Sequence, residues 1–187
     1  MAMRVMGFAG SLRQGSYNRA ALRAATELLP AGVEMDTFDL APIPIYNEDV
    51  RARGFPETVA AFRDGIARAD ALLIVTPEYN YSTSGVLKNA IDWASRPPDQ
   101  PFKSKPIAIM GASPGALGSA RAQYHLRQMF IFLNAYVLNQ PEVMIAQSHQ
   151  KFDEQGNLKD ADTRERIRAL LQALMEWTTK LRAGASK

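Results

Sequence analysis

Residues 10–18, which read Gly-Ser-Leu-Arg-Gln-Gly-Ser-Tyr-Asn, are of types that bind phosphate groups. Gly10 and Gly15 permit a tightly turned backbone that can approach a ligand closely. A helix expected to begin at the end of this segment directs free N–H groups at the same point. Further donors come from four side chains: Ser11, Arg13, Ser16 and Asn18. The segment suits one phosphate, and the alternative is an ordinary polar turn in which Ser16 or Asn18 caps the helix.

The same segment argues against two common nucleotide-binding motifs. Its glycines have the spacing of a triphosphate-binding loop, but Ser16 and Tyr17 stand where that loop requires Lys followed by Ser or Thr. A Gly-x-Gly-x-x-Gly fingerprint is also missing from this place, which weakens the case for Rossmann-type dinucleotide binding. We therefore expect no ATP or GTP hydrolysis at this loop.

Two later segments offer groups that suit a planar ligand. Residues 76–85, Thr-Pro-Glu-Tyr-Asn-Tyr-Ser-Thr-Ser-Gly, combine aromatic, amide and carboxylate side chains that can border a heteroaromatic ring. Packing of Tyr79 and Tyr81 on a neighbouring subunit is the alternative for this segment. Residues 111–118, Gly-Ala-Ser-Pro-Gly-Ala-Leu-Gly, are mostly small and leave room for the edge of such a ring. Together the three segments would hold a phosphate at one end and a ring at the other.

The elements that must position these segments alternate along the chain. Apolar runs of strand length predict strands at 5–9, 33–38, 71–75, 106–110 and 142–146. Apolar residues of helical period predict helices at 18–29, from 56 to about 69, at 84–94, 119–136 and 160–181. Residues 40–55 are expected to form a long loop that contains prolines, and residues 147–160 an exposed polar excursion.

This alternation predicts the fold class. Five strands alternating with five helices indicate an α/β protein, a three-layer sandwich in which helices cover both faces of a five-stranded parallel sheet. The commonest strand order at this count is the flavodoxin-like order 2-1-3-4-5. Such sheets bind ligands beyond the carboxyl ends of the strands where the order reverses, which is where the three segments fall. We expect one domain over residues 1–187.

Composition narrows the function classes. The chain has 187 residues, 22 Lys and Arg against 19 Asp and Glu, a formal net charge of +3, and no cysteine, which excludes iron–sulfur and cysteine-ligated zinc sites. The basic residues are scattered without a run of four, so we expect no nucleic-acid partner. Residues 128–140 are too short for a membrane span, and the first ten residues are too short for a signal peptide. We therefore expect a cytoplasmic protein without a membrane or metal site.

Three motifs resemble the family of NAD(P)H-dependent FMN reductases. They are Gly10-Ser-Leu-Arg-x-Gly-Ser-x-Asn18, Thr76-Pro-Glu-Tyr-Asn-Tyr-Ser82 and Gly85-x-Leu-Lys-Asn-Ala-Ile-Asp-Trp93. Residues 120–128, Ala-Arg-Ala-Gln-Tyr-His-Leu-Arg-Gln, are most similar to its bacterial chromate and quinone reductase branch. The resemblance extends from about residue 4 to residue 180. It implies a flavodoxin-like subunit that binds FMN non-covalently and assembles as a homodimer or homotetramer.

The resemblance also implies which residues bind the cofactor. Matched by position, Ser11, Arg13, Ser16 and Asn18 would hold the FMN phosphate. The isoalloxazine ring would be bordered by Pro77, Glu78, Tyr79 and Asn80, with Ser113 and Gly115 on its other side, and Tyr17 and Tyr81 complete the expected set. For Glu78 we expect the role of an orienting hydrogen-bond acceptor. Arg121, Tyr124 and Glu142 are expected to form a polar contact between subunits.

The implied activity is transfer of hydride from NADH or NADPH through FMN to quinones or other small acceptors, with chromate as a further candidate. The cofactor carries this chemistry, so we nominate no catalytic acid or base. Two alternatives remain. A flavodoxin-type electron carrier would bind FMN without turnover of its own, although such carriers are commonly acidic and this chain is +3. The other alternative is a binding protein without flavin.

Overall fold

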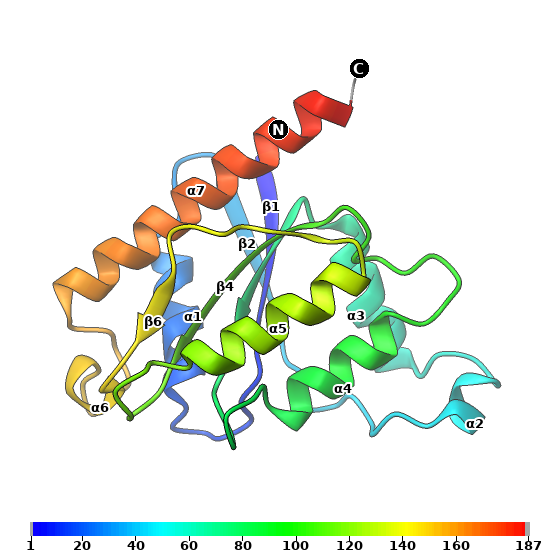
Figure 1. Cartoon of the computed structure of the whole chain (residues 1–187), viewed down its shortest axis with the longest axis horizontal. Coiled ribbons are helices and arrows are strands. Elements are labelled where there is room, and N and C mark those ends of the chain that lie inside the picture. Colours follow the sequence, from blue (N-terminus) through cyan, green and yellow to red (C-terminus); the bar gives the residue numbers. More distant parts are fainter. Residues whose placement is uncertain (1, 186–187) are drawn as a thin grey trace.

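One parallel sheet lies between two layers of helices in the computed structural model, which describes residues 2–185 (Figure 1). The strands are β1 (Met3–Ala9), β2 (Val33–Phe38), β3 (Ala71–Val75), β4 (Pro106–Ala112), β5 (Tyr136–Val137) and β6 (Val143–Ile145). Their order is β2-β1-β3-β4-β5, with β6 also paired to β4, and every pair is parallel. The predicted flavodoxin-like order is therefore confirmed.

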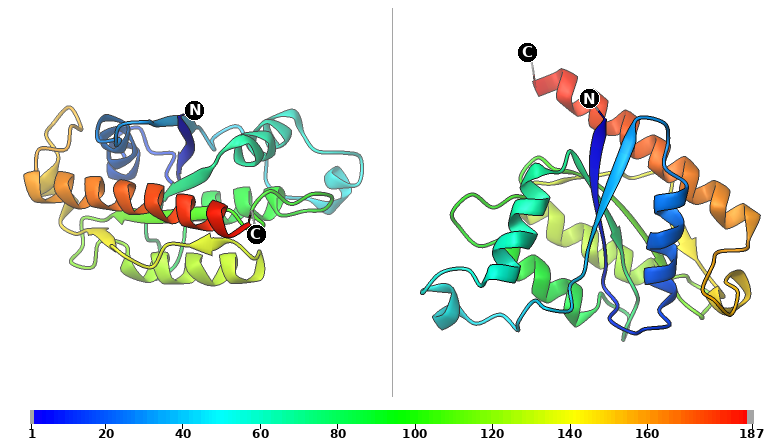
Figure 2. Two further views of the ribbon diagram at one scale, coloured as in Figure 1. Left: turned by 90° about the horizontal axis from the view of Figure 1, so that it is seen from above. Right: turned by 180° about the vertical axis from the view of Figure 1, so that it is seen from behind.

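Helices cover both faces of this sheet. They are α1 (Tyr17–Glu27), α2 (Glu48–Arg51), α3 (Glu57–Arg68), α4 (Gly85–Ala94), α5 (Ala120–Phe132), α6 (Ser148–Lys151) and α7 (Ala161–Ala185). Figure 1 and the right panel of Figure 2 both place α1 and α7 on one side of the sheet and α3 and α4 on the other. Among residues 2–185, no helix combines the length and the apolar composition of a membrane span.

Strand β3 shows how the sequence builds two cores. All five of its residues are fully buried, as a central strand covered on both faces requires. Successive side chains point to opposite faces, so Leu72 and Ile74 pack with α3, α4 and α5, whereas Leu73 and Val75 pack with α1 and α7. Burial on both faces makes the sheet a rigid support for the loops at its ends.

The strand predicted at 142–146 is present as β6, and an additional two-residue strand, β5, lies where the predicted helix at 119–136 was expected to end. Helix α5 ends at Phe132 rather than near residue 136, because Asn134 adopts a left-handed backbone with φ 52° and stops the helix. Residues 136–137 then pair with the beginning of β4, and β6 pairs with its end. Pro141 lies between the two short strands, where the missing N–H of proline interrupts pairing.

Two short helices lie in segments that the sequence predicts as loops. Helix α2 falls within residues 40–55 and begins where the side chain of Asn47 accepts the backbone N–H of Asp49. Helix α6 falls within residues 147–160. Each has only four residues, too few for the apolar period that reveals a helix in the sequence.

Candidate functional site

The carboxyl ends of β1, β3 and β4 border one cavity of about 450 Å³, at the lower edge of the sheet in Figure 1. We call it the loop cavity. Its predicted lining residues are Ser11, Arg13, Ser16, Tyr17, Asn18, Pro77, Glu78, Tyr79 and Ser113, and two more, Ala112 and Pro114, were not predicted. Asn80, Tyr81 and Gly115 lie in the same loops but do not line it. Most of the predicted residues therefore meet in one place.

The loop after β1 presents unpaired backbone donors. Within the described part of the chain, the N–H groups of residues 11–15 donate to no protein acceptor. The loop is closed by the N–H of Ser16, which donates to the carbonyl of Arg13 at 3.1 Å, and by the guanidinium of Arg13, which donates to the carbonyl of Gly15 at 2.7 Å. A run of free amides at the start of a helix fits an anion with several acceptor oxygens.

Two polar residues of this loop already have partners in the fold. The Ser16 hydroxyl accepts the N–H groups of Asn18 and Arg19 and so caps α1, the role that the sequence left open for it. The Asn18 amide donates to the carbonyl of Ala112 at 3.0 Å and accepts the Ala112 N–H at 2.8 Å. Asn18 therefore fixes the beginning of α1 against the end of β4, and both residues shape the cavity wall.

The loops after β1 and β3 are in direct contact. A Cβ atom on Gly10 would lie 2.8 Å from Ser84 Oγ and 3.1 Å from Pro77 Cδ, so this position tolerates only glycine without a shift of its neighbours. The Ser84 hydroxyl donates to the carbonyl of Gly10 at 2.7 Å and accepts the N–H of Leu87, which caps α4. These contacts hold the two loops at a fixed separation.

The loop after β3 presents two exposed aromatic rings. Tyr79 and Ser82 exchange backbone hydrogen bonds of 3.0 and 2.9 Å around Asn80 and Tyr81, which have φ angles of 48° and 67°. Two consecutive positive φ angles define a tight turn of the kind that joins hairpin strands. The exposed fraction is 52% for Tyr79 and 68% for Tyr81, so both rings are accessible from solvent beside the cavity.

Glu78 directs its carboxylate at the start of α5. One oxygen accepts the Nε of Arg121 at 2.6 Å, and the other accepts the backbone N–H groups of Arg121 and Ala122 at 3.0 and 3.3 Å. The side chain of Glu78 is only 8% exposed. The guanidinium carbon of Arg121 lies 3.5 Å from the centroid of the Tyr81 ring. The role of an orienting acceptor thus has a definite partner, which sequence reasoning missed because 43 residues separate the two.

Arg121, Tyr124 and Glu142, which are expected to meet between subunits, also have partners within the chain. The hydroxyl of Tyr124 lies 3.4 Å from the carboxylate of Glu142 in the same chain, and this hydrogen bond raises the pKa of Tyr124. Arg121 instead binds Glu78. Tyr124 and Glu142 thus contact each other within one chain, and Arg121 contacts a residue that lines the loop cavity. A contact of these residues between subunits stays a prediction.

The loop after β4 packs on β6. The Ser113 hydroxyl accepts the N–H of Gly115 at 3.2 Å, and the Ser113 N–H donates to the carbonyl of Ile145 at 3.0 Å. Gly118 has a φ of 55°, and a Cβ atom there would lie 2.6 Å from the backbone carbon of Met144. The carbonyl of Gly115 accepts the N–H of Gln147 at 3.1 Å, and Gly115 is not among the residues that line the cavity.

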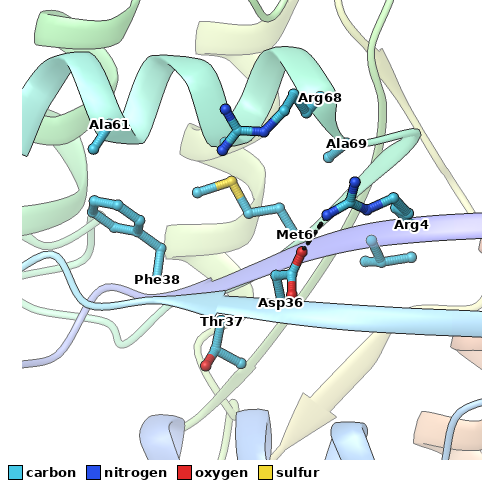
Figure 3. Close-up of a pocket in the computed structure, with 10 residues that line it drawn as sticks. Arg4, Met6, Asp36, Thr37, Phe38, Ala61, Arg68 and Ala69 are labelled. Carbon is cyan, nitrogen blue, oxygen red and sulfur yellow. Dashed lines mark hydrogen bonds and ion pairs between the residues drawn. The ribbon is translucent and has the colours of Figure 1, made fainter.

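Two other hollows lie away from the three loops. One of about 260 Å³ lies between α3 and the strands β1 and β2, with Met6 and Phe38 beneath the helix and the ion pair of Arg4 and Asp36 at its rim (Figure 3). Another of about 630 Å³ lies at the amino edge of the sheet. Neither is lined by the paired loops at the switch in strand order, so the loop cavity is the candidate site.

A sheet of this order, with free amides after its first strand and aromatic residues after its third, defines a mononucleotide-binding protein of the flavodoxin-like class. The sequence profile of NADPH-dependent FMN reductases matches residues 3–150, and the chain belongs to this family. The resemblance drawn from its motifs is confirmed.

Similar proteins agree with this membership. An NAD(P)H-dependent FMN reductase of Pseudomonas aeruginosa is 58% identical over 180 residues, which cover 96% of this chain and 97% of that protein. A quinone reductase of Escherichia coli K12 is 44% identical over 183 residues, covering 96% and 97%. Among solved structures, FerB of Paracoccus denitrificans, a flavoenzyme NAD(P)H:acceptor oxidoreductase, has a TM-score of 0.86, 35% identity, and coverage of 96% and 98%.

Proposed function

We propose that this protein is an NAD(P)H-dependent oxidoreductase that binds FMN non-covalently in the loop cavity and reduces quinones or other small acceptors. The observation that carries the proposal is the meeting of the family motifs around one cavity at the switch in strand order. When bound, FMN supplies the redox chemistry, taking hydride from NAD(P)H and passing electrons to the acceptor. The chain's own residues bind and orient the cofactor.

The loop after β1 suits the phosphate end of FMN. The amides of residues 11–15 have no acceptor among residues 2–185, so a phosphate would satisfy donors that this part of the fold leaves free. The beginning of α1 adds its positive dipole end, and Arg13 adds a full charge. Ser11 and Tyr17 line the same part of the cavity, whereas Ser16 and Asn18 act by holding the loop in shape.

The other two loops suit the ring end. Pro77 and Tyr79 line one wall, and Ser113 and Pro114 line the other. We propose that these walls orient the ring and exclude water, without a catalytic acid or base. The motifs imply that the ring is also bordered by Asn80, Tyr81 and Gly115, and this role stays a prediction. These residues belong to the same loops as the lining residues but do not line the cavity themselves.

We propose quinones as electron acceptors because of the names of similar proteins, one of which is a quinone reductase and another an FMN reductase. Chromate stays a prediction from the resemblance of residues 120–128. A flavodoxin-type carrier is disfavoured by the formal net charge of +3, since electron carriers that dock on basic partners are commonly acidic. A cytoplasmic location is our further proposal, because NAD(P)H is a metabolite of the cell interior.

We also propose that the protein is a homodimer or homotetramer. Helix α5 supports this, because Ile131 and Phe132 at its end have exposed fractions of 78% and 86%. A hollow of about 230 Å³ lies beside them between α4 and α5, lined in part by Ile91, Met129 and Leu133. Neighbouring exposed apolar groups of this kind are typical of surfaces that bind another protein chain.

The test is the visible spectrum of the purified protein before and after anaerobic NADH or NADPH, followed by NAD(P)H oxidation with a quinone. We expect a yellow protein, or a colourless one that becomes yellow with added FMN, whose absorption bleaches with NAD(P)H and recovers with quinone through many turnovers. Absence of turnover by a protein that binds FMN would identify an electron carrier. Failure to take up FMN would contradict the proposal and favour the binding protein.

A further inference from the structure

Helix α5 has no capping side chain of its own. Ser119, its N-cap residue, has a left-handed backbone with φ 71°, and its hydroxyl accepts the side-chain amide of Gln123 at 3.2 Å instead of a backbone N–H of the first turn. The first turn also contains no acidic residue. The leading N–H groups of a helix have no partner within the helix, so a buried helix start needs acceptors from elsewhere.

Glu78 supplies those acceptors from a different loop. Its carboxylate accepts the N–H groups of Arg121 and Ala122 at 3.0 and 3.3 Å and also binds the Arg121 side chain at 2.6 Å. A negative charge at this end of a helix is favourable because the helix dipole is positive there. Glu78 is among the residues that line the loop cavity, but both of its carboxylate oxygens are engaged by α5 and its side chain is only 8% exposed.

This cap joins the two walls of the loop cavity. Pro77 and Tyr79, on either side of Glu78, line one wall, and α5 begins directly after the loop that carries Ser113 and Pro114 on the other. One turn further along α5, Nδ1 of His125 lies 2.9 Å from the hydroxyl of Ser82. The loop after β3 is therefore attached to α5 at two successive turns.

We propose that Glu78 is a positioning residue. By capping α5, and not by contact with the flavin, it fixes the distance between the two walls of the loop cavity that would hold the ring. The inference rests on the proposed FMN site. It differs from the role that the motif implies, in which Glu78 borders the ring. In both roles Glu78 affects FMN binding, but only a cap also affects α5 when FMN is absent.

The experiment compares Glu78→Ala, Glu78→Gln and Arg121→Met with wild type. The glutamine variant keeps a carbonyl oxygen for the helix N–H groups, and Arg121→Met removes the ion pair but leaves the backbone cap. Glu34→Gln is the matched control, since Glu34 is an exposed carboxylate on β2, away from the cavity. The readouts are amide hydrogen exchange at residues 120–123 in protein stripped of FMN, and the Kd for FMN.

We expect Glu78→Ala to accelerate exchange at residues 120–123 of the FMN-free protein and to raise the Kd for FMN about 10- to 100-fold, the loss expected for hydrogen bonds to a charged group. Glu78→Gln should restore most of both properties, and Arg121→Met should change them less than Glu78→Ala does. The control should match wild type. If Glu78→Ala does not fold, the exchange rates of Glu78→Gln and Arg121→Met carry the test.

Two results would overturn the inference. Wild-type exchange in Glu78→Ala together with weakened FMN binding would show a direct contact with the ring. Faster exchange without any change in FMN affinity would show a cap with no bearing on the site. Failure of the wild-type protein to bind FMN is a separate outcome. It would contradict the proposed function and therefore also the role of Glu78 in FMN binding. The exchange rates would then report only on the capping of α5.

Discussion

Arg13 is the only charged residue between positions 10 and 18, so it supplies the one full positive charge of the loop after β1. Its guanidinium carbon lies 5.7 Å from the centroid of the Tyr17 ring, and among residues 2–185 its guanidinium donates a hydrogen bond only to the carbonyl of Gly15 within the same loop. Without a carboxylate partner in this loop, the charge is available to an anionic ligand.

We predict that Arg13→Ala raises the Kd for FMN about tenfold in low salt and less in high salt, because salt screens a charge that is exposed to solvent. Titration of the FMN fluorescence at two ionic strengths measures both values. The control is Arg166→Ala on the surface of α7, where the charge is equal but distant from the cavity. Equal affinities for wild type and Arg13→Ala would refute the phosphate role of this residue.

Residue types predicted most of the loop cavity, but the partners of those residues could not be predicted. Gly10 and Ser11 follow a strand, and the ends of parallel strands share an edge, so their place at the site follows from the sequence. The double hydrogen bond of Asn18 to Ala112 spans 94 residues. Such a contact depends on how α1 and β4 are packed, which no local pattern contains.

At the scale of one element, Asp160 illustrates how a helix start depends on charge. It stands immediately before α7, and its carboxylate accepts the N–H of Thr163 at 2.9 Å and the ammonium of Lys151 at 3.0 Å. Hydrogen bonds from Thr163 and Lys151 lower the pKa of Asp160 from its ordinary value of 3.8 to about 2. Since the folded-state pKa is depressed, Asp160 stabilises the fold above pH 3.8, and this contribution is lost as the pH falls to about 2.

We predict that Asp160→Ala lowers the free energy of unfolding by about 1 kcal/mol at neutral pH, the usual cost of losing an N-cap, with the charge contribution reduced by partial exposure. The difference from wild type should shrink as the pH approaches 2. Urea unfolding at several pH values measures it, and Asp160→Asn, which keeps a capping oxygen, should retain more stability. A difference that is independent of pH would contradict the role of the carboxylate charge.

Element boundaries show where sequence patterns reach their limit. Strands β1 to β4 and the longer helices follow from apolar period and from capping residues such as Ser84. The two-residue β5 and the end of α5 cannot be predicted from such patterns, because both depend on how Asn134 turns the chain back toward β4. A pairing of two residues is too short to leave a period in the sequence.

At the scale of the whole molecule, the exposed end of α5 tests the proposed assembly. We predict that Phe132→Glu shifts the protein to a smaller species, because in the proposed assembly the partner chain would cover the phenyl ring, which is 86% exposed in the single chain, and a carboxylate would have to be buried there. Light scattering coupled to size-exclusion chromatography measures the mass. Thr179→Glu, which adds the same charge on exposed α7 surface, is the control.

Two outcomes bear on that proposal in different ways. An unchanged mass for Phe132→Glu would exclude this surface as the contact between subunits. A monomeric wild-type protein would reject the homodimer and the homotetramer together. The FMN affinity of each variant should follow wild type if the cavity is complete within one chain.

The outer strand of the sheet has a consequence for how copies can join. Within the described chain, β2 pairs only with β1, and its residues include the carboxylates Glu34 and Asp36. A second copy adding its own β2 alongside would bring like charges together across the new seam, which opposes continuation of the sheet from molecule to molecule. Growth into fibrils along this border is therefore disfavoured, and contact between copies is left to the helical faces.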